Sequence, residues 1–131
     1  MATIKSFTSL EQSKVLAEIL PLESADMFYA DLFVGDTHQY IVHPLESYGF
    51  KTFRDTNNRT SKRLNFVPCW SLAALLNVLP SMEIEKVICS DNTYDYRVKV
   101  CIGNKYTGNW YSNPIDACVD MIVGLHKLKM L

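Results

Sequence analysis

The residues of this chain that could do chemistry are its histidines, its cysteines and two pairs of closely spaced aspartates. His38 and His43 could supply imidazole ligands to a metal ion. In a continuous strand, however, positions that differ by an odd number point to opposite faces. The spacing therefore separates the two rings, and we expect two hairpin histidines that bind no metal.

Cys69 is the cysteine whose position best suits a nucleophile. It precedes a predicted helix that begins after Ser71, and a helix N-terminus favours the thiolate. A thiol nucleophile also needs a base within hydrogen-bond reach, and His126 is the only histidine outside the predicted hairpin. Nothing in the sequence brings Cys69 and His126 together. Because the four cysteines also lack the C-x-x-C spacing of a zinc site, we expect free, buried thiols.

Two pairs of aspartates could act as acids and bases or bind a hard cation. Asp116 and Asp120 lie one turn apart in the last predicted helix, and Asp91 and Asp95 flank a predicted turn. Asp116 is explained as a residue of the first helical turn, Asp120 as part of a solvated face, and aspartates are common in turns. The sequence thus assigns no catalytic, cofactor-binding or metal-binding residue, and it favours a protein that is not an enzyme.

A basic segment with aromatic neighbours is the most asymmetric charge feature of the chain. Residues 51–63 carry a net charge of +4, whereas residues 1–50 carry a net charge of −5. Such a segment could bind phosphate and stack bases, or dock an acidic protein. Alternatively, it is a solubilising loop that folds against the acidic half of its own chain. Its candidate contact residues are Tyr48, Lys51, Phe53, Arg54, Arg59, Lys62 and Arg63.

A second candidate surface is aromatic. Tyr106, Trp110 and Tyr111 belong to the last predicted hairpin, and tyrosine and tryptophan are enriched at the energetic centres of protein interfaces. The same side chains could instead cover a sheet edge or pack beneath the last helix. If they are exposed, they form an interaction surface.

Composition sets the class of protein. The chain has 131 residues, is 48% hydrophobic and has a formal net charge of −1, which is typical of one globular domain over residues 1–131. That balance argues against a protein whose whole surface serves nucleic acid. The chain contains no apolar run long enough to span a membrane and no secretory signal at its start, so we expect a cytoplasmic protein.

The elements that must position the candidate residues can be predicted from hydrophobic periodicity and from cap and turn residues. The predicted elements are a helix that begins within Phe7–Glu11 and ends at Pro21, strands over Met27–Val34 and Thr37–His43, a long loop over 45–66, a helix from Leu72 to Pro80, strands over Lys86–Ser90, Tyr94–Ile102 and Tyr106–Trp110, and a helix after Asn113. This order predicts an α+β fold with three helices and an antiparallel sheet of about five strands in two hairpin or meander units.

Individual residues fix the helix starts in this prediction. Thr8 and Glu11 have the spacing of a capping box, and Asn113 followed by Pro114 is a typical start for the last helix. The middle helix is apolar apart from Asn77, so we expect it to be buried on nearly all sides. The strand Tyr94–Ile102 alternates strictly, with apolar and aromatic residues on one face and charges on the other.

A family resemblance rests on two helix starts. The stretches Val67-Pro68-Cys69-Trp70-Ser71-Leu72 and Asn113-Pro114-Ile115-Asp116-Ala117 resemble a pattern of short proteins from gut Bacteroides genomes and their phages. The resemblance spans roughly residues 8 to 128 and rests on caps and core residues, which specify a fold. That group carries no assigned activity. The resemblance therefore implies a small accessory protein of phage-like or mobile-element origin and transfers no site residue.

Taken together, these observations favour a small non-enzymatic interaction protein with a protein partner and no cofactor. It would use either the basic loop or the aromatic hairpin. The alternative is a nucleic-acid-associated accessory factor that binds phosphate through residues 51–63. Homo-oligomerisation stays open, because an exposed edge strand could pair with a second copy of the chain.

Overall fold

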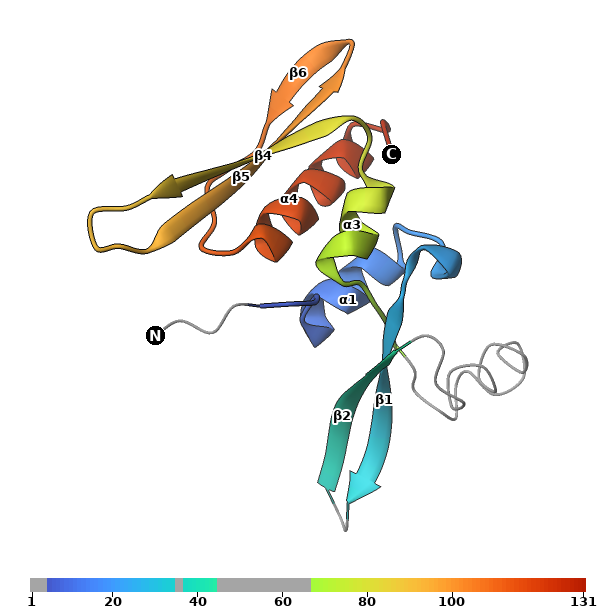
Figure 1. The fold of residues 1–131 in the computed structure, drawn as a ribbon. Helices are drawn as coiled ribbons and strands as arrows, with labels where there is room; N and C mark the ends of the chain where they lie inside the picture. The colour runs from blue at the N-terminus through green and yellow to red at the C-terminus, as the bar shows by residue number, and fades with distance from the viewer. Residues whose placement is uncertain (1–4, 35–36, 45–66) are drawn as a thin grey trace. The chain divides into compact units, whose positions relative to one another are not determined.

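The computed structural model describes residues 5–34, 37–44 and 67–131, and they form an α+β fold (Figure 1). The predicted order of helices and strands is confirmed, and the strands form two antiparallel sheets, β2-β1-β3 and β4-β5-β6. The loop predicted over 45–66 lies outside the described residues. The elements are α1 (Leu10–Ala17), the 3-10 helix η1 (Leu22–Ser24), β1 (Met27–Val34), β2 (Thr37–Pro44), β3 (Val67–Cys69), α3 (Leu72–Val78), β4 (Met82–Ile88), β5 (Tyr94–Ile102), β6 (Asn104–Thr107) and α4 (Pro114–Lys127).

The chain folds as two compact units. One unit comprises Ser9–Trp70, and the other comprises Met1–Thr8 together with Ser71–Leu131. In the first unit β1 pairs with β2 on one side and with the three-residue strand β3 on the other. Its core includes Leu16, Phe28 and Trp70, all of which are almost completely buried, and the Trp70 indole donates a hydrogen bond to the Ser24 hydroxyl at 3.0 Å. The indole thus contributes apolar packing and has a partner for its N–H group.

The first helix begins one residue later than the predicted cap. Ser9 caps α1, because its hydroxyl accepts from the Gln12 backbone N–H and the Gln12 side chain accepts from the Ser9 backbone N–H. The capping box is therefore real, but its residues are not Thr8 and Glu11. The Thr8 side chain is buried instead, and α1 already ends at Ala17, before Pro21.

The second unit packs helices on a three-stranded sheet. Its first residues belong to it through a bridge between Phe7 and Ser71. Ser71 caps α3 and Asn113 caps α4, as the sequence predicts. Helix α3 packs against α4 but is buried only at Ala74 and Leu75, so the prediction of burial on nearly all sides was wrong. The helix has seven residues, and two turns present only a narrow stripe to a neighbour.

The sheet of the second unit is a meander. β5 pairs along its length with β4 and at its end with β6, and its range matches the predicted strand Tyr94–Ile102. β4 begins at Met82, four residues earlier than the predicted start at Lys86, because its Met82–Glu85 half pairs fully with β5. The return into β6 turns at Gly103, which has a positive φ of 70° that suits glycine.

Candidate functional site

The exposed apolar side chains of the described residues gather on the β4–β5 sheet. Eight large hydrophobic residues of the described part of the chain are exposed, and five of them lie on β4, on β5 or on the segment beside β5. These five, hereafter the sheet surface, are Ile84, Val87, Ile88, Tyr94 and Trp110. Clustered apolar exposure of this kind marks interaction sites, whereas single exposed residues are ordinary.

Ile84, Ile88 and Tyr94 lie on one face of the sheet and Val87 and Trp110 on the other, and the first three are exposed because α4 covers only part of their face. We call the face of the sheet that carries Val98 and Val100 the inner face, and the face that carries Arg97 the outer face. Val98 and Val100 are completely buried, and α4 packs on β5. Figure 1 shows the closed end of the β4–β5 hairpin extending beyond α4. At that end the inner face is exposed, with Ile88 at 68% and Tyr94 at 42%.

A lysine lies among the aromatic residues of the exposed inner face. The Lys86 ammonium is 4.1 Å from the centroid of the Tyr94 ring and 5.9 Å from that of the Tyr96 ring. Both distances are within the range of cation–π attraction. Lys86 stands between Ile84 and Ile88 on the same face of β4, so this part of the surface is both apolar and cationic.

The outer face carries a network of charges. Arg97 donates two hydrogen bonds to Glu85, at 3.1 and 3.3 Å, and Lys99 forms an ion pair with the same carboxylate. The Lys99 hydrogen bond and the Arg97 guanidinium lower the pKa of Glu85 below its ordinary value. The Arg97 guanidinium also lies 4.4 Å from the centre of the Trp110 ring. Arg97 thus joins the charge network to the aromatic part of the sheet surface.

A β-bulge places Trp110 on the outer face. The β5–β6 register pairs Lys99 with Thr107, and continuing it would pair Tyr96 with Trp110. The structure instead pairs Tyr96 with Tyr111, through two backbone hydrogen bonds of 2.7 and 2.8 Å. One extra residue between Gly108 and Tyr111 therefore shifts the alternation. As a result Tyr111 lies on the inner face and Trp110 on the outer face beside Arg97.

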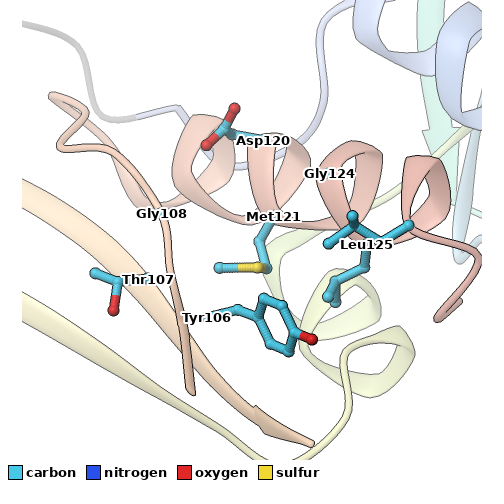
Figure 2. Close-up of a pocket in the computed structure, with 8 residues that line it drawn as sticks. Tyr106, Thr107, Gly108, Asp120, Met121, Gly124 and Leu125 are labelled. Carbon is cyan, nitrogen blue, oxygen red and sulfur yellow. The ribbon is translucent and has the colours of Figure 1, made fainter. Parts of the chain in front are cut away.

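A small pocket lies between β6 and α4. Its volume is about 210 Å³, and it is lined by Tyr106, Thr107, Gly108, Asp120, Met121, Gly124, Leu125 and Leu128. Figure 2 shows the side chains of Tyr106, Met121 and Leu125 converging, while Asp120 points away from them. The space next to Gly124 is open, because a Cβ atom there would meet nothing within 4 Å. The pocket is suited to a small apolar group and presents no set of catalytic groups.

The aromatic residues predicted from the sequence do not form one patch. Trp110 is 40% exposed on the outer face, whereas Tyr106 and Tyr111 are half-buried on the inner face. Burial and a hydrogen bond with Asp120 raise the pKa of Tyr111. The two tyrosines therefore pack near α4, as the alternative interpretation expected. The residues of the predicted basic surface, Tyr48, Lys51, Phe53, Arg54, Arg59, Lys62 and Arg63, lie outside the described residues.

The aspartate pairs have structural partners. Asp116 accepts hydrogen bonds from Lys5 Nζ and from Asn113 Nδ2, each at 2.8 Å. Asp120 is half-buried and bonded to Tyr111, so it is only partly solvated. Asp91 accepts from the backbone N–H and the hydroxyl of Thr93, as expected for a turn residue.

The histidines and cysteines provide no metal or thiol centre among the residues that the structure describes. No group of three potential ligands lies together there. All four cysteines are free, and Cys69 and Cys118 are buried. Cys89 is half-buried and Cys101 exposed, so the expectation of uniformly buried thiols was wrong for these two. Cys101 lies on the outer face of the sheet, opposite to the face on which α4 packs.

Sequence reasoning missed most of the sheet surface. Val87 and Ile88 were not candidates, because an apolar residue in a predicted strand is ordinarily a core residue, and Ile84 precedes the predicted start of that strand at Lys86. One feature of this segment could have indicated exposure, because Glu83, Glu85 and Lys86 alternate with its apolar residues. Charges in that pattern are typical of an edge strand.

Comparison of the chain with protein-family models, curated proteins and solved structures gives no match in any of the three. None of the helices within the described ranges has the length and apolar character needed to span a membrane.

Proposed function

We propose that this chain is a small interaction protein that binds a protein partner through the sheet surface. The observation that carries the proposal is the joint exposure of Ile84, Ile88 and Tyr94 on the inner face, with Val87 and Trp110 exposed on the outer face of the same sheet. Tyr94 and Trp110 supply the aromatic side chains that dominate binding energy in protein interfaces, and each is stacked on a cation that holds its ring. A preformed surface of this kind binds without a large ordering cost.

The proposal includes the accessory role implied by the family resemblance. A phage-like or mobile-element protein of this size would act by occupying a site on a larger partner, for which a surface is sufficient. Neither the sheet surface nor the pocket between β6 and α4 presents a nucleophile paired with a base, which is why we favour binding over catalysis.

Site-specific photo-crosslinking in the cells that naturally produce the protein tests this function. A photoreactive phenylalanine analogue replaces Tyr94 in one variant and Val15 in another, because Val15 is 49% exposed and apolar but lies alone on α1. We expect one discrete crosslinked species from position 94, identified by its mass, and none from position 15. The substitution Ile88→Asp should abolish that species, because a carboxylate in the interface would be desolvated without a partner. Equal crosslinking from both positions would refute the proposal.

The basic segment supports a second candidate function, which is binding of nucleic acid. Residues 51–63 carry a net charge of +4 next to aromatic residues, a combination that suits phosphate contacts and base stacking. Replacing the five lysines and arginines of this segment with glutamine should weaken binding to DNA and RNA and flatten its salt dependence. If the wild-type protein binds neither nucleic acid at low salt, this second function is excluded.

A further inference from the structure

Strand β4 is an edge of its sheet. The sheet order is β4-β5-β6, so within the described residues β4 has β5 as its single strand neighbour. An edge strand presents unpaired backbone N–H and C=O groups that can pair with another strand.

The register of the hairpin identifies the free backbone groups. Cys101 N donates to Ser81 O at 3.2 Å at one end of the β4–β5 pair, and Cys89 N donates to Thr93 O at 2.7 Å at the other. Both contacts belong to the same antiparallel register, in which hydrogen-bonded and non-bonded residue pairs alternate. The odd-numbered residues of β4 therefore bond to β5. The free groups belong to Met82, Ile84, Lys86 and Ile88.

The side chains along this edge differ between the two faces. Ile84 and Ile88 project to the inner face, where they are 37% and 68% exposed. Glu83 and Glu85 project to the outer face, where Glu83 is exposed and Glu85 is shared by Arg97 and Lys99. A strand that pairs with β4 would thus find Lys86 between two isoleucines on the inner face. On the outer face it would find the exposed Glu83 carboxylate, Val87, and a Glu85 carboxylate already paired with two cations.

In the two-fold registers centred on Ile84, Glu85 or Lys86, a second copy of the chain would oppose like charges along this edge. Two β4 strands related by a two-fold axis would place Glu85 against Glu85 in the register centred on that residue, and Glu83 against Glu85 in the register centred on Ile84. The register centred on Lys86 would oppose two ammonium groups. Like charges directly opposite each other destabilise a strand pair.

From this geometry we infer that the free edge of β4 receives an extended segment of a partner protein, in which apolar residues face the inner side and a lysine or arginine faces Glu83 on the outer side. The inference rests on the proposed function and specifies the chemistry of its partner. Backbone hydrogen bonds hold the added strand, and the alternating side chains select it.

Amide hydrogen exchange on the intact protein tests the inference. The probe is a capped peptide of alternating lysine and valine that matches the seven residues of β4, and the control peptide replaces each lysine with glutamate. We expect the lysine peptide to slow exchange at the Ile84 and Lys86 amides, while the Glu85 amide, already bonded to β5, is unchanged. The glutamate peptide should bind roughly fivefold more weakly or worse.

Two variants separate the backbone contribution from the charge contribution. Ile84→Pro removes a free backbone N–H group that β5 does not use, so it should abolish binding of the lysine peptide. Ile84→Ala keeps this N–H group and should weaken binding only in part. Glu83→Lys should reverse the preference between the two peptides. The dispersion of amide resonances checks that each variant is folded.

Three outcomes would overturn the inference. The first is binding that shifts the Tyr94 and Trp110 side chains without slowing exchange at Ile84 and Lys86, which would leave the proposed function intact. The second is that the two peptides bind equally well, or that neither binds. Either result would overturn the inference whether or not position 94 gives a crosslinked species. The third is protection of the same amides without peptide that grows with protein concentration, which would identify a second copy as the partner.

Discussion

Trp110 stacks on Arg97 because a single extra residue interrupts the pairing of the last strand segment with β5. The ring centre is 4.4 Å from the guanidinium carbon, on the outer face of the sheet. In the uninterrupted register Trp110 would lie opposite Tyr96 on the inner face, but Tyr111 takes that place. The bulge therefore converts a side chain that would be buried against α4 into part of the sheet surface.

Deleting Asn109 tests the role of the bulge. The shortened segment should pair with β5 without a bulge, which leaves Tyr111 opposite Tyr96 on the inner face and places Trp110 directly opposite Arg97 on the outer face. We therefore expect the free energy of unfolding, measured by urea denaturation, to fall by less than about 1 kcal/mol, because the inner-face contacts are kept. Asn109→Ala, which keeps the bulge, is the control for the loss of the Asn109 side chain and its hydrogen bond with Tyr111. A loss of about 3 kcal/mol or more in the deletion variant alone would show that the bulge itself is needed to hold the two aromatic residues on their faces.

The shared carboxylate of Glu85 predicts a pH dependence of stability. Hydrogen bonds from Lys99 and Arg97 lower the pKa of Glu85 below its ordinary value of 4.5 in the folded state. The ionised form therefore stabilises the fold above that value, and this stabilisation is lost as the pH falls through the lowered pKa. Glu85→Gln should reduce the urea midpoint at about pH 7, and the reduction should shrink progressively as the pH falls below the ordinary pKa of 4.5. If the difference in urea midpoint between the wild type and Glu85→Gln did not change with pH, the variant would be destabilised by altered packing and not by the loss of the charge.

Two glycines beside the pocket should respond oppositely to alanine. Gly124 lies inside α4 and a Cβ there meets nothing within 4 Å, so Gly124→Ala should stabilise the protein by up to about 1 kcal/mol through helix propensity. At Gly108 a Cβ would lie 3.3 Å from the Val98 carbonyl oxygen, which the sheet holds in place. Gly108→Ala should therefore destabilise the protein by about 1 kcal/mol or more. Thermal unfolding of the two variants measures both effects, and a stabilised Gly108→Ala protein would contradict the close approach.

The four free cysteines should react with a maleimide in a fixed order. Cys101 is exposed and should react first; Cys89 should follow, because a hydrogen bond with Asp95 and partial burial raise its pKa. Burial raises the pKa of Cys118 to about 12, and Cys69 is completely buried, so neither should react until the protein unfolds. Peptide mapping after timed labelling measures the order, and labelling in urea is the control. Rapid reaction at Cys69 in the folded protein would support a thiol nucleophile.

Local sequence patterns determined most of the helices and strands of this protein. The strict alternation of Tyr94–Ile102 and the Asn113-Pro114 start of α4 each depend on interactions between residues that are neighbours in the chain. The capping box of α1 was displaced by one residue, because Thr8-x-x-Glu11 and Ser9-x-x-Gln12 both satisfy the pattern and only the fold buries Thr8. Such ambiguity arises wherever two neighbouring residues have the same local chemistry.

The candidate surface depended on information that no single segment contains. Ile84 and Ile88 have the pattern of core residues, and they are exposed because α4 covers only the part of β5 that carries Val98 and Val100. The position of Trp110 depends on which residue of its segment pairs with Tyr96, and a one-residue shift exchanges the two faces of a strand. Local chemistry therefore determined which elements form, whereas the register between strands and the reach of one helix decided which side chains are available to a partner.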